Sequence, residues 1–544
     1  MRGLMMDRPL LISQQIRHAD LIHGDVAVHS RESDGSTTRT TWRGVHRGAA
    51  RLATALEDLG VGTGERVGTL AWNDRRHLEL YFGVPAMGAV CHTINPRLHP
   101  AELAYVIDHA EDRWLFVDPA FLPLIEAVWP RLGTVEGVVV MTDRSHMPAS
   151  GLPRVLCFDE LVSGRSDRYD WPELDERTAA SLCYTSGTTG HPKGVLYSHR
   201  STVLHALGVS LPDVLGLGEG AVFLPVVPMF HACAWGAPYA CAATGAGLVL
   251  PGAGLDGRSL TALMNEAGVT VTAGVPTIWM GLLKHWAATG EGVPSLRVVS
   301  IGGAAAPASM IRAFEEDWGI EVRHGWGMTE MSPVGTINAL RREQRTLPVD
   351  ERVDLQSSQG RPLFGVEMRV VGEDGTELPW DGESVGELHV RGPWVCSGYY
   401  RLDDSPSHLD DGWFATGDVV TLDARGYVRI TDRRKDLIKS GGEWISSIDL
   451  ENAAMGHPDV AHAAAVGVPD DKWGERPVLF VVPAAGRSPS EEDVVGFLAG
   501  RVAKWWLPDA VVFRDELPVS GTGKVQKARL REAWAATAPP SSPA

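Results

Sequence analysis

The densest group of anion-binding residues in the chain is the stretch 184–195, which reads Y-T-S-G-T-T-G-H-P-K-G-V. Its three glycines allow backbone N–H groups to turn toward an anion. Hydroxyl groups and one ammonium group add further donors, from Thr185, Ser186, Thr188, Thr189 and Lys193. Apolar residues before and after the stretch predict two buried strands. The sequence therefore favours a fold in which two strands meet at a phosphate-binding loop.

Two alternatives to this loop have different residue requirements. A P-loop needs G-x-x-x-x-G-K-[ST], but Pro192 stands at the second glycine and Gly194 replaces the Mg-binding hydroxyl residue. This stretch therefore cannot pass a phosphate to a helix N-terminus in the P-loop manner. A plain surface turn rich in glycine and threonine is the second alternative, and the density of donors disfavours it.

The loop resembles the signature of the adenylate-forming superfamily, which includes acyl-CoA synthetases, firefly luciferase and the adenylation domains of peptide synthetases. Six further motifs of that family follow in order: P-M-F-H at 228–231, G-G-A-A-A-P at 302–307, G-W-G-M-T-E at 325–330, T-G-D at 416–418, D-R-R-K-D-L-I-K at 432–439 and P-V-S-G-T-G-K at 518–524. The resemblance covers nearly the whole chain. It implies a large N-terminal domain and a small, mobile C-terminal lid.

Alternating strand and helix patterns predict the same division. The expected elements are helices at 41–59, 77–87 and 277–285, and buried strands at 66–72, 115–118, 138–141, 269–272 and 297–302. This alternation is typical of layered α/β subdomains. Short strands with Gly/Asp turns from 359 to 430 predict a small β-barrel-like unit. We therefore expect an N-terminal ATP- and acyl-binding domain over 1–431, with the barrel-like subdomain at about 359–431.

A compact α+β module is expected to follow as the C-terminal lid domain, residues 432–536. Its predicted elements are helices at 447–455, 490–505 and 526–536 and strands at 460–468, 477–483 and 510–514. The last eight residues, 537–544, read T-A-P-P-S-S-P-A and are expected to form a disordered tail.

Charge and composition exclude several kinds of partner and compartment. A formal net charge of −18 over 544 residues argues against nucleic acid or an anionic membrane as the main partner. Six scattered cysteines without C-x-x-C spacing suit buried thiols in a reducing compartment. The N-terminus has only a short apolar run with an acid inside it, so a cytoplasmic location is expected. The stretch 220–255 is uncharged, but its prolines favour a buried strand, loop and helix over stable membrane insertion.

The resemblance implies ATP-dependent activation of a small-molecule carboxylic acid. The carboxylate and the α-phosphate are both anions, so a cation between them favours their reaction, and Lys524 matches the family's adenylation lysine. Thr185 and Glu330 are expected to hold Mg²⁺, which prefers oxygen ligands. The residues expected to bind ATP are Thr185, Ser186, Gly187, Thr188, Thr189, Gly190, Lys193, Gly303, Ala304, Trp326, Gly327, Met328, Thr329, Asp418 and Arg433.

The resemblance also assigns parts of the nucleotide to single residues. Asp418 is expected to accept hydrogen bonds from the ribose hydroxyls, and Arg433 to donate to them. Thr329 is expected to contact the α-phosphate. Trp326 departs from the family, which usually has a tyrosine there, although both rings can stack on a purine.

CoA is the expected co-substrate of a second step, in which its thiol displaces AMP from the acyl adenylate. The resemblance implies that the lid rotates about a hinge from Asp432 to Lys435 and exchanges Lys524 for the face that carries Lys439. A ligase that uses a carrier-protein thiol is the alternative within enzymes. A noncatalytic acyl-nucleotide-binding protein is the alternative outside them, and Lys524 and Lys439 argue against it.

His231, Trp235 and Gly302 are the expected acyl-site residues. A spacing of four places His231 and Trp235 on one face if their segment is helical. The resemblance to bacterial fatty acyl-CoA synthetases implies that His231 lies beside the reacting carboxylate, that Trp235 gates the acyl tunnel, and that the protein is a homodimer. No acid is found that would recognise an amino group, so an amino-acid substrate is disfavoured.

Two stretches, 93–98 and 439–447, are most similar to medium- and long-chain fatty acyl-CoA ligases and to methylmercaptopropionate-CoA ligases. Fatty acids and methylthio acids such as 3-methylmercaptopropionate therefore both remain open as substrates.

Overall fold

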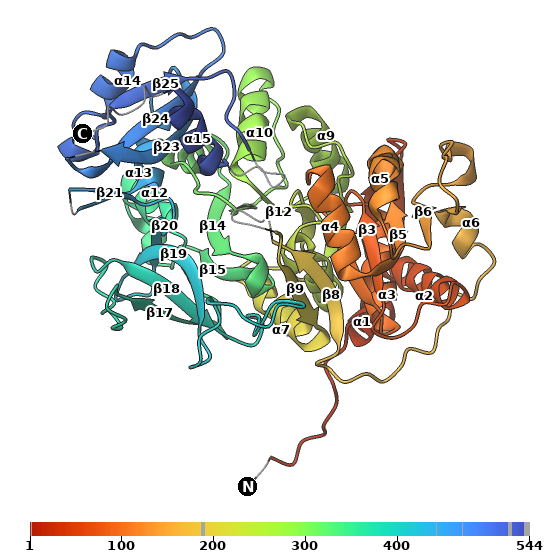
Figure 1. The fold of residues 1–544 in the computed structure, drawn as a ribbon. Coiled ribbons are helices and arrows are strands. Elements are labelled where there is room, and N and C mark those ends of the chain that lie inside the picture. Colours follow the sequence, from red (N-terminus) through yellow and green to blue (C-terminus); the bar gives the residue numbers. More distant parts are fainter. Residues whose placement is uncertain (2, 186–190, 442, 471, 520–524, 538–544) are drawn as a thin grey trace.

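The computed structural model describes residues 1, 3–185, 191–441, 443–470, 472–519 and 525–537. These residues form four sheets, with helices packed on their faces (Figure 1). Two large sheets build most of the chain, and a smaller antiparallel sheet and a C-terminal module follow. The α/β fold class expected from the sequence is confirmed.

The first large sheet has nine strands in the order β16-β15-β14-β13-β12-β10-β11-β1-β2. Its strands are β1 (Ala27–Arg31), β2 (Thr37–Thr41), β10 (Val222–Pro225), β11 (Gly247–Leu250), β12 (Val271–Gly274), β13 (Val298–Ile301), β14 (Glu321–Gly327), β15 (Val334–Asn338) and β16 (Arg361–Pro362). Strands β1 and β10 to β14 run parallel, while β2, β15 and β16 pair antiparallel at the two edges. The strands predicted at 269–272 and 297–302 correspond to β12 and β13.

The second large sheet has seven strands in the order β7-β6-β5-β3-β4-β8-β9. They are β3 (Arg66–Leu70), β4 (Val90–Thr93), β5 (Asp112–Val117), β6 (Gly137–Val140), β7 (Val155–Cys157), β8 (Ala179–Tyr184) and β9 (Gly194–Ser198). Neighbouring strands are parallel except for β8 and β9, which are antiparallel. The loop at 184–195 therefore joins two strands, as the sequence predicts.

Helices cover both faces of each large sheet. The helices between the two sheets are α1 (Ile12–His23), α2 (Trp42–Asp58), α3 (Arg75–Ala86), α7 (His199–Ser210) and α8 (Ala237–Thr244). They pack on one another and share one core with alternate residues of both sheets, for example Val67 and Phe223. Outer faces are covered by α9 (Gly257–Ala267), α10 (Pro276–Thr289), α11 (Ala308–Arg312) and α12 (Val349–Ser357) on the first sheet, and by α4 (Pro100–Ala110) and α5 (Leu122–Val128) on the second. The short α6 (Phe158–Val162) packs against α2.

The third sheet is antiparallel, in the order β17-β18-β19-β20. Its strands are β17 (Glu367–Val371), β18 (Gly386–Arg391), β19 (Phe414–Leu422) and β20 (Val428–Arg433). The change to short antiparallel strands that the sequence predicts after residue 359 is therefore confirmed. Because β20 continues to Arg433, the expected hinge begins inside a strand.

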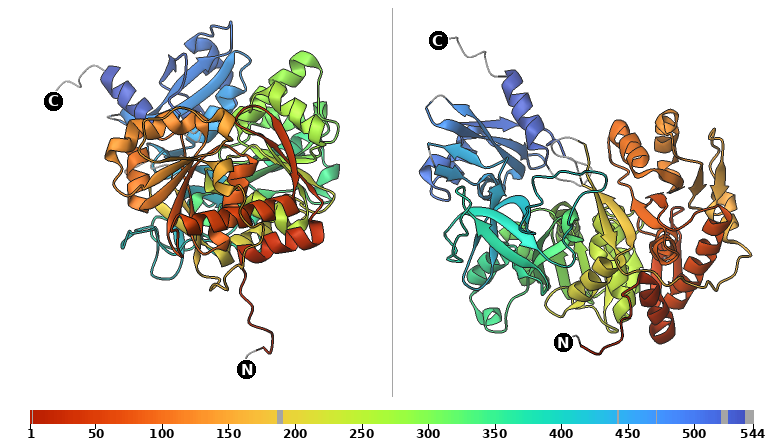
Figure 2. Two further views of the ribbon diagram at one scale, coloured as in Figure 1. Left: turned by 90° about the vertical axis from the view of Figure 1, so that its right-hand side faces the viewer. Right: turned by 60° about the horizontal axis from the view of Figure 1, so that its bottom comes forward.

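The C-terminal module packs three helices with one sheet. Its strands are β21 (Ile438–Ser440), β22 (Glu443–Ile445), β23 (Val460–Asp470), β24 (Gly474–Pro483) and β25 (Ala510–Phe513), and its helices are α13 (Ser447–Met455), α14 (Glu491–Leu498) and α15 (Lys527–Thr537). Figures 1 and 2 show this module (blue) beside the antiparallel sheet (teal), and α13 contacts β20. Apart from Thr537, the predicted tail lies outside the described residues.

One predicted helix is too long. The sequence pattern predicts a helix from 490 to 505, but α14 ends at Leu498, and Lys504–Trp506 forms a separate 3-10 turn. Gly500 lies between them with φ of +83°, in the left-handed region that breaks a right-handed helix. The apolar spacing continues past this glycine, which explains the error.

Two expectations from composition concern burial. Among the described residues all six cysteines are free thiols; five are buried and Cys396 is partly buried. The uncharged stretch 220–255 folds as β10, a helical turn, α8 and β11, which is the predicted strand, loop and helix. No helix of the described chain is long and apolar enough to cross a membrane.

His205 links α7 to the end of the nine-stranded sheet. Its Nε2 accepts a hydrogen bond from the backbone N–H of Val334 at 3.1 Å, and the ring is 1% exposed. Burial lowers the pKa of His205 from 6.5 to about 3, because the interior disfavours the charged ring. The protein therefore stays folded with a neutral imidazole at this position.

Replacing His205 with glutamine should make the protein less sensitive to acid. The unfolded chain binds a proton at His205 below pH 6.5 while the folded chain does not, so stability is present above that pH and is lost as the pH falls. Between pH 7 and pH 5 this amounts to about 2 kcal/mol. Denaturant unfolding at both pH values should show that His205→Gln loses less stability than the native chain. His18→Gln is the matched control, because His18 is exposed. Equal losses of stability between pH 7 and pH 5 in the native protein and in His205→Gln would contradict the low pKa of His205.

Candidate active site

The carboxyl ends of the parallel strands meet at one cavity of about 310 Å³. Residues in the loops that follow strands line it: Asn73 after β3, Thr185 after β8, Val226, Val227, Pro228 and Phe230 after β10, Val275 after β12, Gly302 and Gly303 after β13, and Met328 to Glu330 after β14. In open α/β sheets, ligands bind at this edge because successive loops converge there. The fold therefore brings together motifs that are more than two hundred residues apart.

The neck of the phosphate-binding loop is held by two hydrogen bonds. The Thr185 backbone N–H donates to the Lys193 carbonyl at 2.9 Å, and the Lys193 N–H donates to the Thr185 hydroxyl at 3.1 Å. The Lys193 ammonium lies 4.7 Å from the centre of the Tyr399 ring. Both Thr185 and Lys193 line the cavity. The other predicted loop residues, Ser186, Gly187, Thr188, Thr189 and Gly190, lie outside the described residues.

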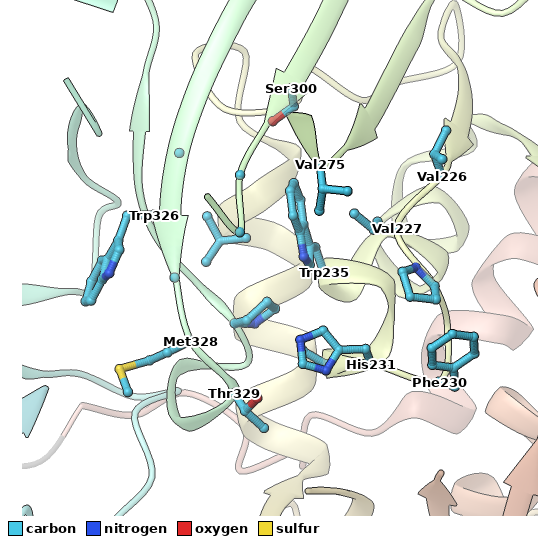
Figure 3. Close-up of a pocket in the computed structure, with 18 of the residues that line it drawn as sticks. Val226, Val227, Phe230, His231, Trp235, Val275, Ser300, Trp326, Met328 and Thr329 are labelled. Carbon is cyan, nitrogen blue, oxygen red and sulfur yellow. The ribbon is translucent and has the colours of Figure 1, made fainter. Parts of the chain in front are cut away.

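The motif that ends β14 supplies one wall of the cavity. Its lining residues are Trp326, Gly327, Met328, Thr329 and Glu330, and Figure 3 shows Trp326, Met328 and Thr329 on one side of the space. The Tyr399 hydroxyl donates to Oε1 of Glu330 at 2.8 Å, and the Tyr197 hydroxyl donates to the Thr329 carbonyl at 2.6 Å. The cavity therefore has a polar end with a carboxylate, a threonine hydroxyl and a lysine.

Asp418 and Arg433 stand next to this polar end. Nε of Arg433 lies 3.1 Å from Oδ1 of Asp418, and Nε1 of Trp326 donates to Oδ2 at 2.8 Å. Arg433 lines the cavity, and Asp418 is buried behind Trp326 and Arg433. Of the glycine-rich segment after β13, Gly302 and Gly303 line the cavity, whereas Ala304 is exposed and is not part of its lining.

The opposite end of the cavity is apolar. Its lining includes Val226, Val227, Val275, Ile278 and Trp235, and Figure 3 shows the first two, Val275 and Trp235 around His231. A Cβ atom placed on Gly302 would lie 2.8 Å from Cη2 of Trp235, so the indole packs directly over that glycine. The three predicted acyl-site residues thus share one end of the cavity.

The segment that carries His231 and Trp235 is not a right-handed helix. Ala232, Cys233, Ala234 and Trp235 have φ of +43° to +57°, and Gly236 follows at +72°. The sequence places His231 and Trp235 on one face only if their segment is helical, and that condition is not met because this turn is left-handed. Left-handed backbone costs about 1–2 kcal/mol per residue, and such strain is often found at functional sites.

Two of the cavity residues that the sequence analysis missed hold the site through hydrogen bonds. The Asn73 side chain donates to the carbonyls of Pro225 and Val227 and accepts from the Met229 N–H, so it fixes the loop before His231. A polar residue directly after the strand predicted at 66–72 was the available signal for it. Tyr399, which holds Glu330, carries no comparable signal in the sequence.

The predicted second-step lysine lies outside the cavity lining. Lys439 Nζ is 2.9 Å from Oε1 of Glu373 and 4.0 Å from the centre of the Trp444 ring, and its side chain is 59% exposed. Lys524, the predicted adenylation lysine, lies outside the described residues. The structure therefore presents Lys439 on the surface next to the antiparallel sheet.

The predicted hinge residues differ in their surroundings. Asp432 is buried, and its carboxylate accepts hydrogen bonds from the backbone N–H groups of Arg433 and Ser447, both at 2.7 Å. Ser447 begins α13, so Asp432 is fastened to the C-terminal module. Lys435 is exposed on the segment between β20 and β21.

Comparison with known proteins gives full-length matches. The AMP-binding enzyme family matches residues 17–400, and the AMP-binding enzyme C-terminal domain matches residues 449–524. A 3-methylmercaptopropionyl-CoA ligase of Ruegeria lacuscaerulensis is 52% identical, and a medium-chain-fatty-acid CoA ligase of Ectopseudomonas oleovorans is 47% identical, each over 98% of both chains. The crystal structure of an anthranilate CoA ligase with anthranoyl-AMP superposes with a TM-score of 0.86 at 28% identity, over 98% of this chain and 99% of that one.

The chain belongs to the AMP-binding enzyme family. The polar and apolar ends of its cavity suit a reaction between a nucleotide and an acyl group. Within the family it is an AMP-forming acyl-CoA ligase, a class that uses ATP, CoA and a carboxylic acid.

Proposed function

We propose that this ligase activates aliphatic carboxylic acids, with short methylthio acids such as 3-methylmercaptopropionate foremost and medium-chain fatty acids next. The observation that supports this is the apolar end of the cavity, where valine and isoleucine side chains and an indole surround His231. Trp235 packs over Gly302 and limits the length of an acyl chain in this state. The names of the relatives at 52% and 47% identity support the same two acid classes.

The polar end supplies the groups that the first half-reaction needs. We assign the binding of phosphate oxygens to Lys193 and Thr185, of the α-phosphate to Thr329, and of the ribose to Asp418 with Arg433. Trp326, Gly327, Met328 and Gly303 surround the base, and Ala304 lies next to them. We assign His231, which lines the cavity, to the reacting carboxylate of the acid. Lys524 neutralises the two reacting anions in adenylation, and Lys439 serves thioester formation after the lid has turned about Asp432 and Lys435.

Mg²⁺ fits the same end of the cavity. Glu330 contributes a carboxylate and Thr185 a hydroxyl to one lining, and these are the hard oxygen donors that Mg²⁺ prefers. Tyr399 orients the Glu330 carboxylate through its hydroxyl. When bound, the ion would neutralise charge on the phosphates of ATP, while Glu330 and Thr185 would hold it.

The test is an acid panel assayed with ATP and CoA. Straight-chain acids from C3 to C18 and methylthio acids are compared for AMP release and thioester formation. We expect CoA-dependent turnover with the short methylthio and medium-chain acids. Formation of acyl-AMP without transfer to free CoA would instead support the alternative, a ligase that delivers acyl groups to a carrier protein.

Replacing Trp235 with alanine should weaken the discrimination between acids of different length. The substitution removes a side chain that can bury 150–250 Å² and opens the space over Gly302. Each methylene held by a pocket wall is worth about 1–3 kcal/mol, so loss of the wall brings the rates for short and long acids closer together. The chain-length profile and the melting temperature are measured on the same variant. A lower melting temperature with an unchanged profile would show that Trp235 is only a core residue.

We also propose that the chain divides between residues 431 and 432 into an N-terminal domain and a mobile lid. It forms a homodimer through the N-terminal domain. The enzyme works in the cytoplasm. These proposals rest on the resemblance to fatty acyl-CoA synthetases and, for the cytoplasm, on six cysteines that suit a reducing compartment. A monomer mass measured by light scattering at micromolar protein concentration would contradict the proposed homodimer.

A further inference from the structure

Trp326 lines the cavity and also contacts Asp418, which is buried behind it. Its Nε1–H donates to Oδ2 of Asp418 over 2.8 Å, and the two residues are only 7% and 2% exposed. They are 92 positions apart in the chain, one on β14 and the other on β19. This hydrogen bond therefore joins the nine-stranded sheet to the antiparallel sheet at the polar end of the cavity.

The same carboxylate is held from its other side. Arg433 lies opposite Asp418 in the β19–β20 register, with its Nε 3.1 Å from Oδ1. The Asp418 backbone N–H donates to the Thr416 hydroxyl, which in turn donates to the Leu388 carbonyl. Oδ2 thus accepts a hydrogen bond from the indole, and Oδ1 lies beside the Arg433 guanidinium charge. Each oxygen can still accept another hydrogen bond, since a carboxylate has about four acceptor positions.

The chemistry of the indole makes this contact directional. An indole N–H only donates and points in the plane of its ring, and a carboxylate only accepts. Without that donor, the buried Oδ2 atom would have to find another partner, and the carboxylate would turn away from its present orientation. A phenylalanine at position 326 would keep an aromatic ring beside the nucleotide but would lose this control.

We propose that Trp326 is a positioning residue for sugar recognition: its N–H fixes Asp418 so that the carboxylate accepts from the ribose hydroxyls, which makes the site selective for ribonucleotides over 2′-deoxyribonucleotides. This inference rests on the proposed function, in which Asp418 binds the ribose of ATP. It adds a specificity role to a residue otherwise expected only to stack on the base.

The test compares ATP with 2′-deoxy-ATP in the native enzyme and in Trp326→Phe. A hydrogen bond to a charged group carries about tenfold or more in binding. We therefore expect KM for ATP to rise about tenfold or more in Trp326→Phe, KM for 2′-deoxy-ATP to rise less, and kcat to change little. Calorimetry in the absence of turnover should show the same change, namely a smaller difference in affinity between AMP and 2′-deoxy-AMP in Trp326→Phe than in the native enzyme. Trp326→Tyr, which keeps a ring and a donor, should recover part of the selectivity.

Two further variants separate positioning from stability. Trp286→Phe is the matched control, because Trp286 is also buried and donates from Nε1 to the Thr261 hydroxyl at 2.9 Å. It lies on α10, in the core between α10 and α9, and does not line the cavity. It should lower stability and leave the ratio of the two nucleotides unchanged. Adding Trp326→Phe to the Asp418→Asn variant should change its selectivity between ATP and 2′-deoxy-ATP little, because Trp326→Phe acts through Asp418.

Three results would overturn the inference. They are an unchanged preference for ATP over 2′-deoxy-ATP in Trp326→Phe, additive effects of Trp326→Phe and Asp418→Asn on that preference, and an equal loss of that preference in Trp286→Phe. If Trp326→Phe does not fold, Trp326→Tyr and Asp418→Asn supply the comparison, and native selectivity in Asp418→Asn would overturn it. Failure of the proposed function gives a different result, namely a native protein that binds neither AMP nor ATP.

Discussion

Lys524→Ala should slow the formation of acyl-AMP about a thousandfold while largely sparing thioester formation from supplied acyl-AMP. Two unit charges about 4 Å apart interact by about 4 kcal/mol at an effective dielectric constant of about 20. Losing about 4 kcal/mol of transition-state stabilisation when the lysine is removed corresponds to a rate about a thousandfold lower. The charge acts in one half-reaction, so the two steps should separate. Pyrophosphate release measures the first step, and conversion of synthetic acyl-AMP with CoA measures the second.

Lys439→Ala is the matched variant for the other half-reaction. In this structure the Lys439 ammonium pairs with Glu373 on the surface, outside the cavity lining, so its loss should affect adenylation little. Thioester formation should fall more than adenylation if the lid brings Lys439 to the cavity. Equal losses of both steps in Lys524→Ala, or native CoA-dependent turnover in Lys439→Ala, would contradict the scheme of two lid orientations.

Lys527→Met should destabilise the C-terminal module by about 3–5 kcal/mol. Lys527 Nζ lies 2.7 Å from Oε1 of Glu451 and also contacts the Ser447 hydroxyl, and the Lys527 and Glu451 side chains are only 11% and 17% exposed. Removing the lysine leaves a buried carboxylate without its counter-charge, and that is costly. Burial raises the pKa of the nearby Asp432, and the charge of the Lys527 ammonium opposes part of that rise. Hydrogen exchange of the amides in β23 and β24 measures the loss within the module.

The control is the exposed pair that Lys439 of the same module forms with Glu373, a residue that follows β17 of the antiparallel sheet. Lys439 and Glu373 are 59% and 77% exposed, so Lys439→Met should cost less than about 1 kcal/mol. If both methionine variants lose the same stability, the burial of the Lys527–Glu451 pair has no special effect.

The sequence predicts the elements of this fold well where local patterns decide them. The helix predicted at 447–455 matches α13, and the strands beside the phosphate-binding loop match β8 and β9, because apolar spacing reports burial directly. The helix predicted at 490–505 fails at Gly500, where the apolar pattern continues but the backbone turns left-handed. Pattern alone does not distinguish a glycine inside a helix from one that ends it.

The site is less fully predictable, because its contacts join distant segments. Motifs identify Glu330, Asp418 and Trp326 one by one, but no local signal says that the Trp326 indole donates to Asp418, since that contact depends on how two sheets pack. Asn73 and Tyr399 support site residues through hydrogen bonds and belong to none of the motifs. The left-handed turn was missed because alanine and cysteine give no indication of positive φ.

That left-handed turn restricts how the ligase could be redesigned for other acids. Residues 232–235 combine positive φ with burial or a cavity-facing side chain, and β-branched residues strongly avoid such backbone. Valine, isoleucine and threonine are therefore poor choices there, whatever space the acyl group leaves. A mutagenesis library has more freedom at Val226, Val227 and Ile278, none of which has a positive φ. Variation in acid preference should accumulate at those three positions while the turn keeps its small residues.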